Sequence, residues 1–453
     1  MTLPKTRIPD LKPEEMFILN CLQRMFSKGG SLSLSRSHFA GVNWDNIFET
    51  ALQWNIAPML YRFIKRSPAI LQRMPIPGEV YKSIEAAYIK TYMVNQANLS
   101  ELVELVRRLK SADIEVLLLK GAHLAPFVYG DVGMRWMADI DILIRRRDLE
   151  KTHKVLLNRG YDYADVPQVV WDDFGRRKEM KSQAEVLRWY KTDHMHLPYY
   201  HPTAIQRLEV HWRIAKSASP FSIDTKGLWE RARTQKLNGE TVKLLSLEDL
   251  LLHISLHDAY YHQLTLFGLR PCCDMAAVVG YLSGQINWDL LQKRACEWGM
   301  EKYLHLMLRL SQELLGTDIP GHLSRIIRDK ACDDRVFLQG VRRILDKENE
   351  APLYTGMKYP SKIQVFNPGD DFFKKLGFFL KRIPLSRREL ASRYCLPASS
   401  ARVWLYYPVR LASLLYSYGR VYLCYFRYRL KQGRAHSAGY SLDLWLKSPF
   451  SRS

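Results

Sequence analysis

The sequence of 453 residues lacks a long uncharged apolar run. The most apolar late segment, Val403 to Phe426, is interrupted by Arg410 and Arg420 and falls short of the roughly 18 uncharged residues that suggest a spanning helix. Residues 1–13 are polar and contain prolines, with no charged segment leading into an apolar core. We therefore expect neither a transmembrane helix nor a secretory signal, and we expect the protein in the cytoplasm.

Paired cysteine motifs are missing as well. The seven cysteines include no CxxC pair, and this odd, scattered set predicts reduced thiols rather than a disulfide framework or a zinc site. With 47% apolar and 25% charged residues, the composition is that of a globular protein. The length is sufficient for two or three domains.

Acidic residues are scarce near the C-terminus. From Lys358 to Ser453, 18 lysines and arginines stand against 4 aspartates and glutamates, so this stretch carries +14 of the net +21. Aromatic and basic residues alternate in groups from Phe372 to Leu390 and from Val403 to Lys431. This pattern is typical of segments that bind an anionic membrane surface, and less so of nucleic-acid binding, because no known module is visible. The alternative is a packed helical subdomain whose core contains these aromatic residues.

Two aspartates follow an apolar run that ends in Lys120-Gly121. The run Val116 to Leu119 predicts a buried strand, and a second strand-like segment carries Asp139 and Asp141. Residues at positions i and i+2 of a strand project from the same face. Both carboxylates are therefore expected on one side of a sheet.

A third carboxylate occurs in the segment LEVHWRI at Leu208 to Ile214. Its alternation places Glu209, His211 and Arg213 on one face. Three converging carboxylates repel one another unless a cation lies between them. Oxygen-rich sites suit Mg²⁺, with Mn²⁺ as the alternative ion, and predict metal-assisted phosphoryl or nucleotidyl transfer.

These motifs carry a family resemblance. KGA, R-x-x-x-D-I-D-I-L-I and L-E-V-H-W-R closely resemble the uncharacterised bacterial nucleotidyltransferase-like family within the DNA polymerase beta-type nucleotidyltransferase superfamily, from about residue 42 to residue 310. The resemblance implies that Gly121 is the turn glycine, that Asp139 and Asp141 bind the metal, and that Glu209 is the third acidic residue. Ala122 stands where a serine is usual.

Four further residues are candidates for binding the nucleotide. Lys120 offers a cation to the triphosphate, and Gly121 lets the backbone approach the phosphates. His123 to Tyr129 predicts a short helix whose N-terminus would face them. Arg135 is expected at a phosphate, with a surface ion pair as the alternative, and His211 at a phosphate or the acceptor, with a structural hydrogen bond as the alternative.

The predicted fold is α+β, with a small mixed nucleotidyltransferase sheet between helical regions. Residues 1–113 form the N-terminal helical region, including a helix that starts at Asn43-Trp44-Asp45 with an asparagine or aspartate cap and a long helix from Val80 to about Lys110. Residues 114–245 form the nucleotidyltransferase core, residues 246–350 a helical domain, and residues 351–453 the basic aromatic-rich region. The sequence pattern that begins at Asn43 occurs again at Asn287 and predicts a second capped helix there. His253 and His257 share one helix face, where we favour packing over a zinc site.

The predicted function is Mg²⁺-dependent transfer of a nucleoside monophosphate from an NTP to an unknown hydroxyl or phosphate acceptor. Asp139, Asp141 and Glu209 are the expected catalytic and metal-binding residues. The resemblance points to a sugar or lipid-linked acceptor in surface-polysaccharide synthesis. The alternatives are a nucleic-acid-binding protein and a peripheral membrane scaffold, each with a catalytically silent nucleotidyltransferase fold.

Overall fold

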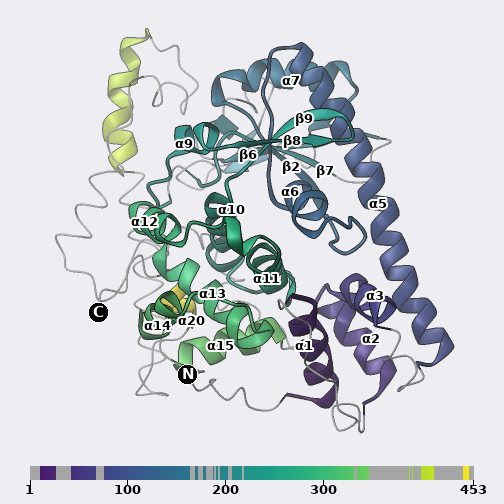
Figure 1. The fold of residues 1–453 in the computed structure, drawn as a ribbon. Helices are drawn as coiled ribbons and strands as arrows, with labels where there is room; N and C mark the ends of the chain where they lie inside the picture. The colour runs from purple at the N-terminus through teal and green to yellow at the C-terminus, as the bar shows by residue number, and fades with distance from the viewer. Residues whose placement is uncertain are drawn as a thin grey trace.

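The computed structural model describes residues 11–26, 42–67, 76–163, 169–171, 177–179, 187, 190–191, 194–202, 207–216, 219–330, 334–345, 387, 390, 399–412 and 442–447. Along this part of the chain a mixed sheet is preceded by one group of helices and followed by another, and in space the two helical groups pack against each other on the same side of the sheet (Figure 1). This arrangement confirms the predicted α+β class.

The main sheet of the described residues has seven strands in the order β3-β6-β7-β2-β1-β9-β8. At its centre β2 pairs in parallel with β7 and antiparallel with β1, and β6 pairs antiparallel with β7. A separate two-stranded antiparallel sheet is formed by β4 (Val169–Trp171) and β5 (Arg177–Glu179). The strands of the main sheet are β1 (Leu117–Leu118), β2 (Asp139–Leu143), β3 (Asp162–Tyr163), β6 (His196–Tyr200), β7 (Arg207–His211), β8 (Arg233–Leu237) and β9 (Glu240–Leu244).

The N-terminal helices end in one long helix that reaches the sheet. Asn43 caps α2 as predicted, since its side-chain oxygen accepts hydrogen bonds from the backbone N–H groups of Asp45 and Asn46. The long helix α5 packs at its start on α3 and, over its last turns, on the sheet core (Figure 1). Its observed extent confirms the predicted helix. The helices are α1 (Pro13–Phe26), α2 (Trp44–Gln53), α3 (Ala57–Arg66) and α5 (Gly78–Ser111).

Two short helices flank the strands of the core. The first, α7 (Leu149–Asn158), begins after Asp148, whose side chain makes no capping hydrogen bond. Gly160 follows the helix with a positive φ of 89°, a conformation that glycine adopts without steric cost. The second, α9 (Thr225–Glu230), is capped by Asp224 through the backbone N–H of Gly227.

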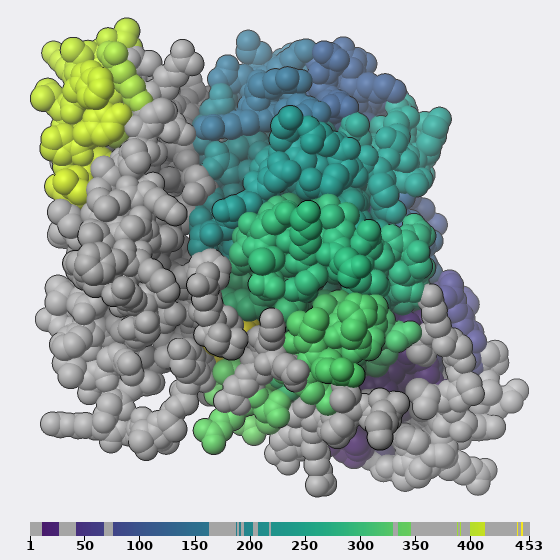
Figure 2. Space-filling model, turned by 60° about the vertical axis from the view of Figure 1, so that its left-hand side comes forward, coloured from purple at the N-terminus to yellow at the C-terminus, as the bar shows by residue number. Residues whose placement is uncertain are grey.

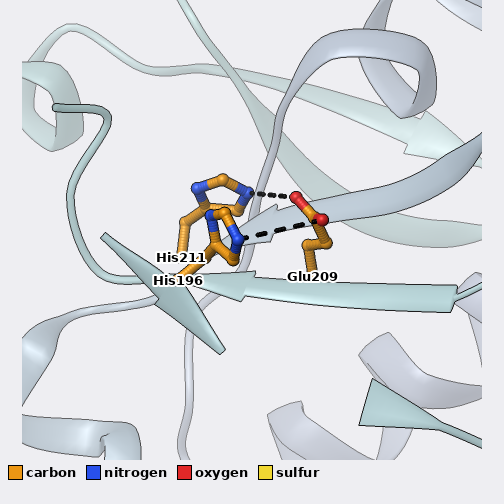
Figure 3. Close-up of side chains that lie close together, drawn as sticks. All are labelled: His196, Glu209 and His211. Atoms are coloured by element: carbon orange, nitrogen blue, oxygen red, sulfur yellow. Dashed lines mark ion pairs between the residues drawn. The ribbon is translucent and has the colours of Figure 1, made fainter. Parts of the chain in front are cut away.

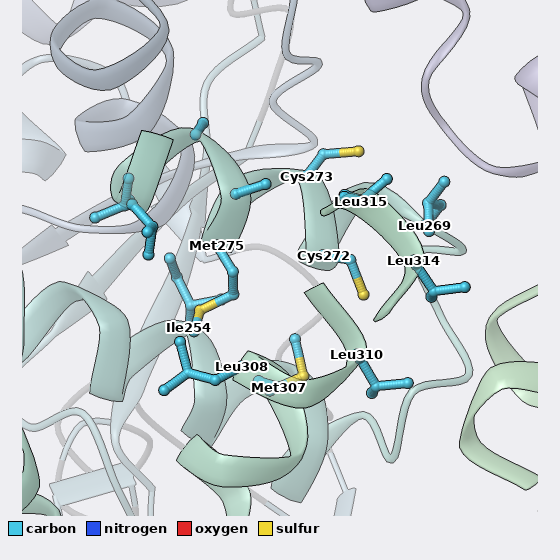
Figure 4. Packing of buried hydrophobic residues seen from close by; sticks show 14 of the residues in the cluster. Ile254, Leu269, Cys272, Cys273, Met275, Met307, Leu308, Leu310, Leu314 and Leu315 are labelled. Carbon is cyan, nitrogen blue, oxygen red and sulfur yellow. The ribbon is translucent and has the colours of Figure 1, made fainter. Parts of the chain in front are cut away.

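A second helical group follows the sheet and packs beneath it (Figures 1 and 2). Sulfur-containing and aliphatic side chains of α10, α11 and α13 form its core, including Cys272, Met275 and Met307 (Figure 4). Asn287 caps α12 through the backbone N–H of Leu290, so both segments that share this sequence pattern, α2 and α12, are capped helices. The helices are α10 (Leu247–Ser255), α11 (Arg270–Leu282), α12 (Trp288–Trp298), α13 (Glu301–Leu315), α14 (Gly321–Lys330) and α15 (Asp334–Leu345).

One piece of the C-terminal region is packed against this helical group. In α20 (Leu442–Lys447) the side chain of Trp445 is buried, and the backbone carbonyl of Leu446 accepts a hydrogen bond from the Tyr303 hydroxyl at 2.7 Å. This piece therefore belongs to a packed core. Most of Phe372 to Leu390 and of Val403 to Lys431 lies outside the described residues, and their binding partner stays a prediction. No helix of the described chain is long and apolar enough to cross a membrane.

Candidate active site

The register of the central strands brings the three predicted carboxylates together. β2 and β7 run in parallel with Asp141 directly beside Glu209, and Asp139 lies two residues earlier on the same face of β2. Asp139, Asp141 and Glu209 each offer an oxygen within 4.8 Å of the others. The alternation of apolar and acidic residues thus places all three carboxylates at one point on the sheet.

The ammonium of Lys120 lies among these carboxylates. Lys120 follows β1 with a positive φ of 42°, and its Nζ lies 2.8 Å from Asp141 Oδ1 and 3.7 Å from Glu209 Oε2. Burial lowers the pKa of Lys120, but the attraction of the three carboxylates outweighs it and raises the pKa overall. We call Asp139, Asp141 and Glu209 the acidic cluster. Lys120 is therefore a charged partner of the acidic cluster in this structure, and its contact with a triphosphate stays a prediction.

The pKa values of the three carboxylates are shifted in different directions. Burial and the neighbouring charge of Asp141 raise the pKa of Asp139 to about 7. Burial acts in the same direction on Asp141 and Glu209, but it is outweighed by Lys120 and His211 at Asp141 and by His211 at Glu209, so both pKa values are lowered. At neutral pH Asp141 and Glu209 are ionised, whereas Asp139 is close to its midpoint.

Gly121 is fixed by packing rather than by a turn. It lies in the short helix α6 (Lys120–Leu124), where a β-carbon would approach Met137 Cγ to 2.7 Å and Arg135 Nη1 to 2.9 Å. The helix predicted from His123 thus begins three residues earlier, and a π-helical segment, η2 (Ala125–Tyr129), continues it. A glycine is required here because Arg135 and Met137, which precede β2, pack directly against this helix.

Arg135 lies in a buried ion pair with the helical group. Its guanidinium donates from Nε and Nη2 to the carboxylate of Asp274 in α11 at 2.9 to 3.1 Å, and the Tyr129 hydroxyl donates to the same carboxylate at 2.9 Å. Only 7% of Arg135 is exposed, so the ion pair that we gave as the alternative to a phosphate contact exists but is internal rather than at the surface. Its role at a phosphate stays a prediction.

Two histidines lie beside the carboxylates. His211 is buried, with Nε2 2.8 Å from Asp141 Oδ1 and 3.5 Å from Glu209 Oε2. Burial lowers its pKa, but the hydrogen bonds with Asp141 and Glu209 outweigh burial and raise it. His196 of β6, which we did not predict, lies opposite His211 with Nε2 3.8 Å from Glu209 Oε1 (Figure 3). Its position in the alternating segment HLPYY is the sequence signal that could have identified it.

The other histidine pair forms no metal centre within the described residues. His253 lies in α10 and His257 in the adjoining segment η4 (Leu256–Tyr261), which is π-helical. Burial lowers the pKa of both imidazoles, to about 3 for His253, so both are neutral. His257 makes a hydrogen bond with His262, in agreement with the packing role we favoured.

The acidic cluster fits a divalent metal. Asp141 Oδ2 is buried and has no hydrogen-bond partner among the described residues, although a buried carboxylate oxygen without a partner is costly. When all three carboxylates are ionised, they carry more negative charge than Lys120 and a protonated His211 compensate, and a divalent cation would neutralise the remainder. Asp139, Asp141 and Glu209 could therefore hold such an ion.

Comparison with known proteins agrees with this geometry. The sequence model of one protein family, described as uncharacterised nucleotidyltransferase, matches residues 40–316, which is 277 of the 453 residues. No curated protein and no solved structure matched the chain. The matched range contains β2 and β7 with all three carboxylates, and it confirms the resemblance seen in the motifs. The chain belongs to this family of uncharacterised nucleotidyltransferases.

Proposed function

We propose that the protein is a Mg²⁺-dependent nucleotidyltransferase that moves a nucleoside monophosphate from an NTP to a hydroxyl or phosphate acceptor. The observation that carries this proposal is the convergence of Asp139, Asp141 and Glu209 within 4.8 Å in a chain of a nucleotidyltransferase family. The Oδ2 atom of Asp141 adds to it, because this buried oxygen needs a partner and none of the described residues supplies one.

Asp139 and Asp141 would hold the metal, and Glu209 would complete its oxygen ligands. Carboxylate oxygens suit Mg²⁺, with Mn²⁺ as the alternative. When bound, the ion supplies positive charge to the phosphate oxygens of the NTP. The ligand set comes from two adjacent strands of a sheet, so the protein presents it in a fixed geometry.

Lys120 and His211 would bind the nucleotide or position the carboxylates. Lys120 already lies 2.8 Å from Asp141, so its ammonium is held at the place where a triphosphate would meet the acidic cluster. His211 holds Asp141 and Glu209 in their ionised forms. Glu209 in its ionised form can accept a proton from the acceptor hydroxyl. Gly121 and Arg135 lie in close contact with each other and would keep the segment before β2 in place.

The acceptor we propose is a sugar or a lipid-linked group in surface-polysaccharide synthesis. This proposal for the acceptor rests on the family resemblance alone. A hydroxyl and a phosphate acceptor differ in the product that forms, so identifying the labelled product decides between them.

The test is a screen of α-labelled NTPs with Mg²⁺ and cell extract, in which transfer of label into product is followed. We expect transfer by the wild type and a loss of about 10³-fold or more in Asp139→Asn and Asp141→Asn, because each removes a charged ligand from the site. Asp148→Asn is the matched control, since Asp148 follows β2, pairs loosely with Arg147 at 3.8 Å and is not one of the three clustered carboxylates. Wild-type activity in both cluster variants would contradict the proposal.

A further inference from the structure

A second group of ligand-type side chains lies directly beside the acidic cluster. The antiparallel register of β6 and β7 places His196 opposite His211, and Glu209 precedes His211 by two residues on the same face. Figure 3 shows both imidazoles turned toward the Glu209 carboxylate. Glu209 therefore belongs to both groups.

The spacing of these side chains matches a single metal ion. The Nε2 atoms of His211 and His196 lie 3.5 Å and 3.8 Å from the Glu209 oxygens, and the nearest ligand atoms of all three residues lie within 4.8 Å of one another. Zinc bonds of about 2.0 to 2.2 Å in a tetrahedral site put neighbouring ligand atoms about 3.4 Å apart. Small rotations of the side chains would complete that geometry.

We propose that His196, Glu209 and His211 form a binding site for a transition-metal ion of the zinc class. Two imidazole nitrogens and one carboxylate are ligands that Zn²⁺ and similar ions prefer, whereas Mg²⁺ prefers oxygen alone. The inference goes beyond the proposed transfer reaction, which requires only the oxygen ligands. It assigns to this sheet two neighbouring cation sites of different chemistry that share Glu209.

Metal binding requires an unprotonated nitrogen on each imidazole, so it releases any proton held there. The register of β6 and β7 places the Nε2 atoms of both His196 and His211 beside the Glu209 carboxylate. His153 differs from both, because it is buried at a distance from the cluster and makes a hydrogen bond with the Tyr199 hydroxyl at 3.0 Å.

The test is titration of the full chain with ZnCl₂ in excess Mg²⁺ and without nucleotide, followed by calorimetry. We expect one zinc ion per wild-type chain, at least about ten-fold weaker binding in His196→Gln, and wild-type binding in the control His153→Gln. Asp139→Asn should retain zinc binding, because Asp139 contributes no ligand to this site. Absence of binding by the wild type, or equal binding by His196→Gln, would overturn the proposal.

A second measurement covers the case in which His196→Gln misfolds. Co²⁺ bound to the wild type should show the intense visible absorption of a tetrahedral site, and added Zn²⁺ should remove it. A spectrum unchanged from Co²⁺ in buffer would also overturn the proposal. Neither experiment contains an NTP, so an inactive protein that binds zinc and an active protein that does not are distinguishable outcomes.

Discussion

Two groups of buried charges in this protein differ in how completely they are satisfied. Arg135 and Asp274 form a matched pair, with three hydrogen bonds between them and a fourth from Tyr129. The acidic cluster on the sheet sets three carboxylates against Lys120 and His211, and Asp141 Oδ2 has no hydrogen-bond partner in the part of the chain that the structure describes. A satisfied group holds two parts of the structure together, whereas an unsatisfied group retains capacity for a further cation.

The matched pair joins the sheet to the helical group. Arg135 precedes β2, and Asp274 lies in α11, so the pair fixes the segment that delivers Asp139 and Asp141. Removing one partner of such a pair leaves an uncompensated buried charge. Removing charge from the acidic cluster relieves repulsion instead. The same change, aspartate to asparagine, should therefore have opposite effects on stability in the two groups.

The largest expected effect is at the matched pair. Asp274→Asn should lower the free energy of unfolding by about 3 to 5 kcal/mol, because the Arg135 guanidinium stays buried without its counter-charge. Urea denaturation measures the change. The control is Glu79→Gln, which removes an exposed pair with Lys82 and should change stability by less than about 1 kcal/mol. A small effect at Asp274 would show that this junction is not held by charge.

A gain in stability is expected at the acidic cluster. The pKa of Asp139 is near 3.8 in the unfolded chain and rises to about 7 in the folded protein, through burial and the charge of Asp141. Between these values the unfolded chain has released a proton that the folded protein still holds, so stability falls as pH rises through this window. Asp139→Asn should therefore raise the free energy of unfolding at pH 8 without divalent cations by about 2 kcal/mol, less than the full shift implies because solvent screens part of it.

Denaturation at pH 5 and pH 8 in a chelator checks this gain. The increase for Asp139→Asn should be larger at pH 8, since the folded protein has then ionised Asp139 against its surroundings. Asp148→Asn should show no such difference between the two pH values. A loss of stability at pH 8 would mean that Asp139 is as well compensated as Asp274, and the contrast between the groups would disappear.

The smallest expected effect is at Gly121, which packs between the two groups. Gly121→Ala should cost at least about 1 kcal/mol, because a β-carbon would overlap Met137 and the Arg135 guanidinium. Gly78→Ala is the matched control, since a β-carbon there meets nothing within 4 Å. Thermal denaturation of both variants gives the comparison. Equal melting temperatures would show that the segment before β2 can move away from α6 at little cost.

Local patterns were sufficient to predict part of this site. Alternation within a strand puts Asp139 beside Asp141 and Glu209 beside His211, and it needs no knowledge of the rest of the chain. The caps at Asn43 and Asn287 are equally local. Each of these predictions depends on residues within a few positions of one another.

Pairings between distant segments could not be predicted. Arg135 and Asp274 are 139 residues apart, and no nearby residue indicates which carboxylate the arginine meets. The direction of Lys120 depends on a positive φ that is uncommon for a lysine. The alternation around His196 is visible in the sequence, but the register that sets His196 opposite His211 depends on the connection between β6 and β7.

The parallel pairing of β2 with β7 also has a consequence for the order of folding. Asp141 and Glu209 are adjacent in the sheet but 68 positions apart in the chain, and β7 fills the place between β2 and β6. Parallel neighbours need a long crossover connection, whose closure costs entropy before any contact forms. During synthesis the ribosome completes the first two acidic residues long before the third. A cation can therefore bind all three carboxylates only after β7 has paired with β2 at the centre of the sheet.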